Sequence, residues 1–212
     1  MMFDIAQPSL PTTDGRRFPV RRIFCVGKNY RAHAAEMGDA DAAPVFFMKP
    51  AHAVFVPQED GPLPYPLGTS NLHHETELVV ALGEGAAPLG VAAGCDLTRR
   101  DLQAEAKAAG APWDAAKGLD HGAVLGPLAL GPVPDAGRIA LSVNGEARQD
   151  GDLADMVLGV PALMGALARL WTLRPGDLIF TGTPSGVGPL ERGDACKIEI
   201  EGCPDLRFTV AA

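Results

Sequence analysis

Two acidic residues, Glu75 and Glu77, lie in a segment that otherwise has the pattern of a buried β-strand, "HHETELVVALG" (residues 73–83). Residues i and i+2 of a strand face the same side of a sheet, so the two carboxylates are expected to point together. Carboxylates held side by side repel each other, and burial strengthens the repulsion. A hard divalent cation removes this penalty, because carboxylate oxygens are its preferred ligands. An exposed strand face without an ion is the alternative interpretation.

A third carboxylate, Asp96, ends the apolar stretch "VAAGCD" and stands just before a predicted helix (98–110). Side chains at such a strand-to-helix junction can project into a cleft, so Asp96 is the expected third ligand. Three carboxylates without a second histidine or a cysteine favour Mg²⁺ or Mn²⁺ over Zn²⁺. The alternative role of Asp96 is to cap the helix, for which Thr98 is the first candidate and Asp101 would complete a capping box.

A histidine and a glutamate, His33 and Glu36, are three residues apart in "NYRAHAAEMG" (29–38), which is predicted to be a short helix. This spacing places them on one helical face within reach of each other. A carboxylate beside an imidazole raises its basicity and fixes its tautomer, as a general base for water requires. A pair on the helix surface is the alternative. The run "GDADAA" (38–43) that follows is expected to let the segment move as a lid.

Several cations have unusual positions for a chain of net charge −8, namely Lys28, Lys49, Arg99 and Lys117. A lysine in a cleft needs an anion, which is either a protein carboxylate or a ligand. The stretch "FTGTPSGVG" (180–188) offers backbone N–H groups and the Thr183 hydroxyl, which together are able to hold an oxyanion. A tight turn that requires glycine is the alternative for this stretch.

The elements that must position these side chains are mostly strands. Strands are predicted over 21–28, 44–50, 74–83 and 90–97, with a hairpin around Asn144-Gly145 and two strands in 193–210. The stretch 175–188 is predicted to be a turn, a strand and a glycine-rich loop. Helices are predicted over 29–38, 98–110 and 160–173. The fold class is therefore α+β, mainly β, and the 212 residues are expected to form a single domain (1–212) with an N-terminal extension (1–20).

The bulk composition excludes some partners. The net charge of −8 argues against nucleic acid or an anionic membrane surface as a partner. No apolar run approaches the length of a membrane span, and the N-terminus lacks the pattern of a signal peptide. The expected location is therefore the cytoplasm.

Taken together, several stretches resemble the fumarylacetoacetate hydrolase family, in the family's order and over residues 22–200. They are "VGKNYRAHAAEMG", "PVFFMKP", "NLHHETEL", "GCDLTRRDLQAEAKAAGAPWDAAKGLDHGAVLGP", "LSVNGEARQDG" and "PGDLIFTGTPSGVGPLERGD". The resemblance implies a mixed β-roll with a few short helices, a homodimer, and a divalent metal on Glu75, Glu77 and Asp96. It also implies that His33 and Glu36 of a lid helix activate water.

The same resemblance assigns residues to the substrate. Lys117 and Thr183 match residues that meet the keto-acid end of the substrate, and Lys117 is accordingly a candidate catalytic residue. Lys49, Arg99 and Gln103 match polar residues that line the pocket, and Lys28 is a further candidate for substrate binding. One departure concerns pocket shape, because relatives often have a phenylalanine where this chain has Leu119.

The expected activity is that of the acylpyruvate and fumarylpyruvate hydrolases of aromatic catabolism. Such an enzyme cleaves a C–C bond in a 2,4-diketo acid and releases pyruvate and a carboxylic acid, with a metal stabilising the pyruvate enolate. Oxaloacetate decarboxylation, or isomerisation and decarboxylation of dienoate diacids, is the alternative on the same site. A non-catalytic protein that binds a keto acid is the alternative of another class.

Overall fold

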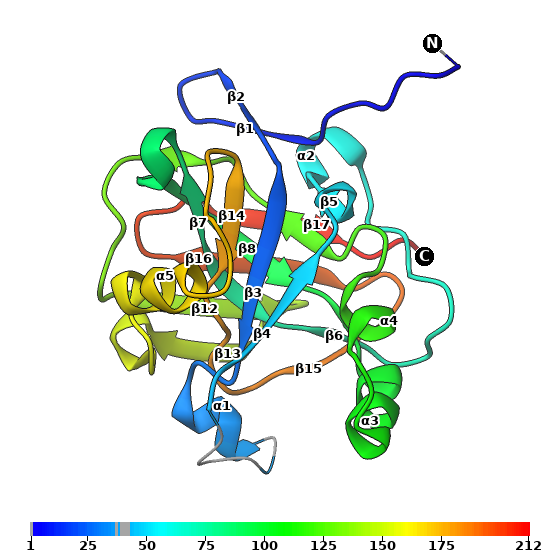
Figure 1. Cartoon of the computed structure of the whole chain (residues 1–212). Helices are drawn as coiled ribbons and strands as arrows, with labels where there is room; N and C mark the ends of the chain where they lie inside the picture. The colour runs from blue at the N-terminus through cyan, green and yellow to red at the C-terminus, as the bar shows by residue number, and fades with distance from the viewer. Residues whose placement is uncertain (1, 37, 39–42) are drawn as a thin grey trace.

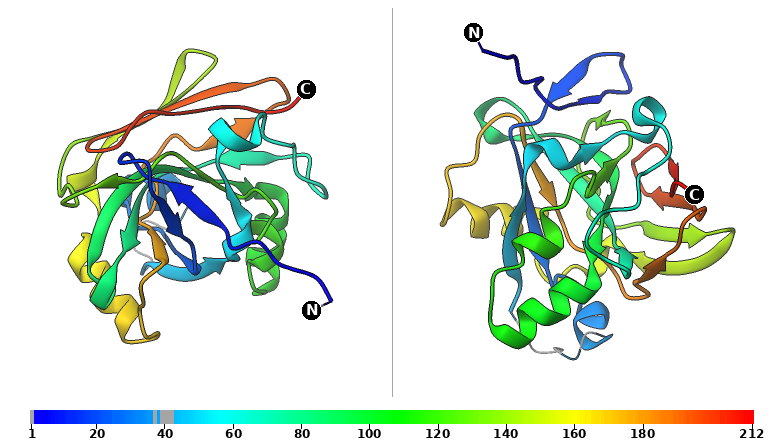
Figure 2. Two further views of the ribbon diagram at one scale, coloured as in Figure 1. Left: turned by 90° about the horizontal axis from the view of Figure 1, so that it is seen from above. Right: turned by 90° about the vertical axis from the view of Figure 1, so that its right-hand side faces the viewer.

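Alternating apolar residues build a central mixed sheet, which positions most of the residues discussed above. The computed structural model describes residues 2–36, 38 and 43–212. In sheet order the strands are β4 (Val45–Lys49), β3 (Arg22–Gly27), β14 (Asp177–Phe180), β7 (Thr76–Leu82), β8 (Pro88–Asp96), β10 (Ala123–Leu125) and β5 (Val54–Phe55), with β11 (Ala129–Leu130) also paired to β8. The β3–β14 and β5–β10 pairs are parallel and the other pairs are antiparallel. Seen from above, this sheet curls round on itself (Figure 2).

A second, antiparallel sheet covers one face of the curled sheet (Figure 1). Its strands are, in order, β13 (Glu146–Asp152), β12 (Arg138–Val143), β16 (Ala195–Ile200) and β17 (Leu206–Thr209). The predicted hairpin turn is confirmed, because Asn144 and Gly145 both have positive φ (53° and 82°), as a type I′ turn requires. Two smaller sheets comprise β1 (Ser9–Pro11) with β2 (Arg17–Pro19), and β15 (Gly188–Leu190), β6 (Leu72–His74) and β9 (Thr98–Arg99).

The helices are short and lie around the sheets (Figure 1). They are α1 (Arg31–Glu36), α2 (Pro57–Asp60), α3 (Arg100–Ala109), α4 (Asp114–Lys117) and α5 (Val160–Ala168), with 3-10 turns η1 (Ala51–Ala53), η2 (Glu84–Ala86) and η3 (Leu153–Asp155). Within the described ranges, none of them has the length and apolar character that crossing a membrane takes. The predicted class, α+β and mainly β, is confirmed.

The apolar core has two parts, one on each face of the curled sheet. Alternate residues of β7 divide between them: Leu78 and Val80 pack toward the second sheet, whereas Val79 and Ala81 face the interior of the curl. Leu10, Phe18 and Val20 from the N-terminal hairpin and the residue after it close one end of that interior. Both faces of β7 are thus buried, which explains its nearly continuous apolar sequence.

Three predicted helix boundaries are wrong. The helix expected from residue 29 begins at Arg31. The helix expected from Thr98 begins at Arg100, because Thr98 and Arg99 pair with β6 as strand β9. The expected capping box is absent, since Asp101 instead accepts hydrogen bonds from Thr69 and Ser70 of the preceding loop. The C-terminal end is as predicted, with Gly110 in the left-handed conformation. Helix α5 ends at Ala168, short of the predicted residue 173.

Candidate active site

The three predicted acids converge where β7 begins and β8 ends. Glu77 belongs to β7, Glu75 immediately precedes it, and Asp96 is the last residue of β8. The antiparallel register pairs Glu77 with Gly94, and the Asp96 amide donates to the Glu75 carbonyl (2.8 Å), so the strand ends meet. One oxygen from each carboxylate lies within 4.8 Å of the others, and all three side chains are buried.

Three cationic side chains form ion pairs with two of these acids and balance their negative charge. The Lys117 ammonium lies 2.7 Å from Glu75 Oε2 and 2.7 Å from Asp96 Oδ2. Lys49 Nζ lies 2.8 Å from Asp96 Oδ1, and Arg100 lies 2.6 Å from Glu75 Oε1. Burial alone would lower the pKa of Lys117, but the two carboxylates outweigh it and raise that pKa above its usual value. The metal-free arrangement thus favours the charged form of Lys117.

The third acid, Glu77, is the one whose charge is not compensated. It accepts a hydrogen bond from the Gly182 amide (2.7 Å), and among the described residues it makes no ion pair. Burial raises the pKa of Glu77 well above its usual value, and the charges of Asp96 and Glu75 raise it further. Three hard oxygen donors that converge, one of them without an ion-pair partner among the described residues, fit a divalent cation of the Mg²⁺ or Mn²⁺ type.

Beside this group, helix α1 holds the predicted histidine–glutamate pair. Nδ1 of His33 lies 3.2 Å from Oε2 of Glu36, and the His33 side chain is mostly buried. The Gly186 amide donates to both oxygens of Glu36 (3.1 and 3.2 Å). A carboxylate is an acceptor only, so Nδ1 is the donor in this contact, and in the neutral imidazole Nε2 is then the nitrogen with a lone pair. The lid predicted for residues 38–43 falls mostly outside the described residues.

The glycine-rich loop after β14 was expected to hold an oxyanion. Its backbone amides do bind carboxylates, but these are side chains of the protein and not a ligand. Gly182 and Gly186 both have positive φ (95° and 94°), and a Cβ on Gly186 would overlap the Arg148 carbonyl oxygen. Their amides donate to Glu77 and Glu36 respectively. The loop thus links the acid triad to the His33–Glu36 pair.

A small pocket opens between these groups, with a volume of about 30 Å³. It is lined by Gly27, Lys28, His33, Phe47, Glu75, Arg100, Gln103, Lys107, Trp113 and Lys117. That volume corresponds to about one or two water molecules. A keto acid therefore enters only if side chains or helix α1 shift outward.

Of the other residues predicted to bind substrate, two line the pocket and three do not. Lys28 and Gln103 line the pocket, and Lys28 has a positive φ of 63°, which is unusual away from glycine. Thr183 is buried and accepts a hydrogen bond from Gln149 (2.8 Å). Lys49 pairs with Asp96 and does not line the pocket, and Arg99 donates to the Ala115 carbonyl (2.8 Å) and not to the acids.

Sequence reasoning missed several residues of the site. Arg100, rather than its neighbour Arg99, contacts Glu75 and also donates to Gln103. Gln149 is buried and connects Thr183 and the Pro184 carbonyl with the backbone of Thr76. Phe47 and Trp113 form an aromatic pair at the pocket (6.0 Å between centroids). Leu119, in contrast, packs in the core and does not line the pocket.

Two adjacent buried or half-buried histidines, His73 and His74, should make the metal-free protein less stable at acid pH. Burial, followed by the Arg100 charge, lowers the pKa of His73 to about 4, and burial also lowers the pKa of His74. Groups that are neutral when folded but protonated when unfolded stabilise the protein fully above pH 6.5 and progressively less as the pH falls toward 4. Between pH 7 and pH 4.5 the free energy of unfolding of wild type should fall. For the His73→Asn variant this fall should be smaller by about 1 kcal/mol, a figure that allows for the partial exposure of His73.

Urea unfolding in chelator at the two pH values measures this difference. His52→Asn, at an exposed position, is the matched control. Equal losses in wild type and His73→Asn would contradict the assignment of acid sensitivity to this histidine.

The chain is similar to known proteins over most of its length. The family model described as fumarylacetoacetate (FAA) hydrolase C-terminal matches residues 22–211. The chain is 40% identical to oxaloacetate tautomerase FAHD1, mitochondrial, from Arabidopsis thaliana (89% of this chain and 90% of the relative), and 39% identical to oxaloacetate tautomerase YcgM from Escherichia coli (87% and 90%). A crystal structure of fumarylpyruvate hydrolase from Pseudomonas aeruginosa in complex with Mn²⁺ and pyruvate superimposes with a TM-score of 0.95 at 40% identity, covering 100% of this chain and 99% of that one.

Proposed function

This chain belongs to the fumarylacetoacetate hydrolase family, and we propose that it is a metal-dependent hydrolase of acylpyruvates. Its substrate is a 2,4-diketo acid of the fumarylpyruvate type, and its products are pyruvate and a carboxylic acid. The likeness in fold to a fumarylpyruvate hydrolase that holds Mn²⁺ and pyruvate supports this choice.

The observation that carries the proposal is the fixed His33–Glu36 pair beside the acid triad. Glu36 is held by the Gly186 amide and in turn accepts from His33 Nδ1, which leaves Nε2 free to take a proton. His33 and Glu75 line the same pocket, so a base and a metal-binding group face one volume. Hydrolysis needs this combination, because water must be deprotonated where the keto acid is bound.

The reaction then follows from these groups. His33 Nε2 takes a proton from a water whose oxygen attacks the acyl carbonyl carbon, two carbons away from the 2-oxo group. The bond between that carbon and C3 breaks, its electron pair remains on C3 as the enolate of pyruvate, and the acyl group leaves as a carboxylic acid. The protonated His33 is placed to return its proton to C3, which completes pyruvate.

The cations of the site neutralise the charge that develops. Arg100 and Lys117 flank Glu75 at the pocket and are positioned to orient the carboxylate of the substrate. A divalent cation held by Glu75, Glu77 and Asp96 would supply Lewis-acid stabilisation of the negative charge on the keto-acid oxygens. To accommodate such a cation, Lys117 Nζ has to withdraw from at least one of the two acids that it bridges.

A second candidate function is tautomerisation of oxaloacetate, which the similarity to the oxaloacetate tautomerases of Arabidopsis thaliana and Escherichia coli favours. Oxaloacetate has a 2-oxo acid end like that of an acylpyruvate. Its keto and enol forms interconvert by moving one proton between C3 and the 2-oxygen, without water and without C–C cleavage. The His33 base would serve this reaction as well.

An assay on three substrates tests the proposal. We expect the protein with Mn²⁺ or Mg²⁺ to convert fumarylpyruvate or acetylpyruvate to one equivalent of pyruvate, and we expect a chelator to abolish this activity. Heat-treated protein with the same metal is the control for spontaneous decay. If no acylpyruvate yields pyruvate while the enol form of oxaloacetate converts faster than in the control, the second candidate replaces the first. If none of the three substrates reacts, the proposal of an enzyme acting on these keto acids is wrong.

A further inference from the structure

The first residues of the chain form an exposed apolar arm. Met2, Phe3 and Ile5 are 97%, 74% and 85% exposed, and the segment has no regular secondary structure. Figure 1 shows it extending away from the body beyond β1. Three large apolar side chains within four residues, all in water, are typical of a segment that is buried against a partner.

The base of the arm is fixed, and its direction is set by local chemistry. The Gln7 side-chain amide donates to the Val20 carbonyl, and the Val20 amide donates to the Pro8 carbonyl (2.8 Å). A residue that precedes proline favours extended conformations, which suits an arm that continues away from its base at Gln7. The arm therefore leads away from the surface at its own base.

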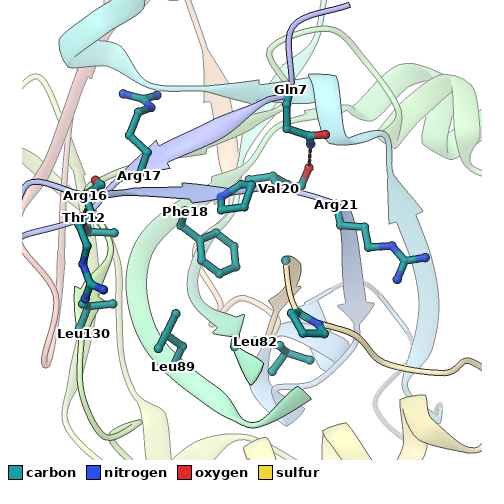
Figure 3. A pocket seen from close by; sticks show the side chains of 14 residues that line it. Gln7, Thr12, Arg16, Arg17, Phe18, Val20, Arg21, Leu82, Leu89 and Leu130 are labelled. Carbon is teal, nitrogen blue, oxygen red and sulfur yellow. Dashed lines mark hydrogen bonds between the residues drawn. The ribbon is translucent and has the colours of Figure 1, made fainter. Parts of the chain in front are cut away.

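A groove lies at that base, between the β1–β2 hairpin and the rim of the central sheet. Its volume is about 550 Å³. Figure 3 shows Phe18, Leu82 and Leu89 around its apolar interior, with Gln7 at its edge. Leu82 is the last residue of β7, whereas Glu77 is near the start, so the groove is at the opposite end of the sheet from the acid triad. The groove is thus separate from the active site.

Three arginines lie on the rim of the groove. Arg16 and Arg17 lie on it and pair with Asp14 and Glu59. Arg21 also lines the groove and has no acidic partner among the described residues. In an extended arm Phe3 and Ile5 share one face and Asp4 is on the other. Apolar side chains toward an apolar floor, with a carboxylate toward an arginine, make the arm complementary to this groove.

We propose that residues 2–6 of one copy of this chain dock in the hairpin groove of a second copy. Because each groove lies beside the base of its own arm, a two-fold axis near the hairpins places each arm at the groove of the other copy. Such an exchange is isologous: the same surface is used twice, and the assembly closes as a dimer. Phe3 and Ile5 fill the apolar floor, and Asp4 pairs with Arg21.

The oligomeric state in solution tests this interface. We expect wild type to sediment as a dimer and the Phe3→Ser/Ile5→Ser variant to dissociate with a Kd raised by about 100-fold or more, since two apolar side chains are lost from each arm. Leu89→Arg, which changes the groove instead, should have the same effect. Leu67→Ser alters a side chain that is 86% exposed elsewhere on the surface and should leave the dimer intact.

Cross-linking identifies which groove the arm occupies. In an Ile5→Cys/Leu89→Cys variant, oxidation should produce a covalent dimer on a non-reducing gel, while either single variant should not. A covalent monomer with an internal cross-link would show that the arm binds its own groove and would overturn the proposal. A monomeric wild type, or a dimer unaffected by the arm and groove variants, would overturn it as well.

Discussion

The Glu77→Gln variant is expected to lose divalent-cation binding and turnover while remaining folded. Gln is nearly the same shape as Glu, and its amide oxygen can still accept the hydrogen bond from Gly182. It removes the one carboxylate of the triad that has no cationic partner among the described residues, so the negative charge available to the metal falls. We expect the affinity for Mn²⁺, measured by calorimetry, to fall by more than about 100-fold, the upper end of losses caused by changes outside the ligands themselves.

Stability in chelator provides the control for this variant. The pKa of Glu77 is raised by burial and by Asp96 and Glu75, so the folded metal-free protein binds the Glu77 proton more tightly than the unfolded chain does. That contribution is fully present below the ordinary pKa of about 4.5 and is lost as the pH rises through the raised value. At pH 7 the metal-free Glu77→Gln protein should be at least as stable as wild type. Unchanged Mn²⁺ affinity would contradict the assignment of Glu77 as a ligand.

The His33→Gln variant is expected to lose hydrolysis but not the metal. Because glutamine cannot take a proton from water, acylpyruvate cleavage should fall by about 10²–10⁴-fold. Mn²⁺ affinity should stay within about threefold of wild type, since His33 is not one of the three converging acids. Pyruvate release in a steady-state assay measures the first effect, and calorimetry measures the second.

A matched control lies on the same helix. Arg31 is exposed on α1, so Arg31→Gln changes the helix without changing the pair. Its hydrolysis should equal that of wild type. If His33→Gln retains at least half of the wild-type rate, water is not activated by this histidine. If His33→Gln also loses tautomerisation of oxaloacetate, one base serves both reactions.

The acid triad was predictable because its geometry depends on local rules. Alternation along a strand brings Glu75 and Glu77 to one side, and a junction after β8 brings Asp96 to the same edge of the sheet. One detail of the predicted strand 74–83 was wrong, because Glu75 lies between β6 and β7 and not within a strand. The three acids nevertheless converge as expected. The same reasoning gave the His33–Glu36 contact from helical spacing. The Glu36–Gly186 bond was not predictable, because it joins residues far apart in the chain.

The arginine that contacts Glu75 was not predictable from the sequence. Arg99 and Arg100 are adjacent, and they separate only because β9 ends and α3 begins between them. In the strand Arg99 turns toward the Ala115 carbonyl, whereas Arg100 in the helix reaches Glu75. A shift of one residue in the predicted helix start is enough to exchange them. Boundaries of elements are the least reliable part of a sequence-based prediction.

Lys49 illustrates a different limit. Its position in an apolar strand indicates that it needs an anion, but not which one. In the folded chain the partner is Asp96, together with the carbonyl oxygens of Leu97 and Lys117. A lysine paired inside the protein and a lysine that awaits a substrate have the same sequence pattern. Only tertiary contacts distinguish the two.

Anomalous scattering from a crystal of the wild-type protein soaked with Mn²⁺ and oxalate, an analogue of the pyruvate enolate, tests the central claim most directly. The account predicts one strong peak about 2.0–2.3 Å from an oxygen of each of Glu75, Glu77 and Asp96, with Lys117 Nζ displaced from between the acids. Oxalate should then occupy an enlarged pocket next to His33. A peak at any other position, or none among the three carboxylates at saturating Mn²⁺, would contradict it.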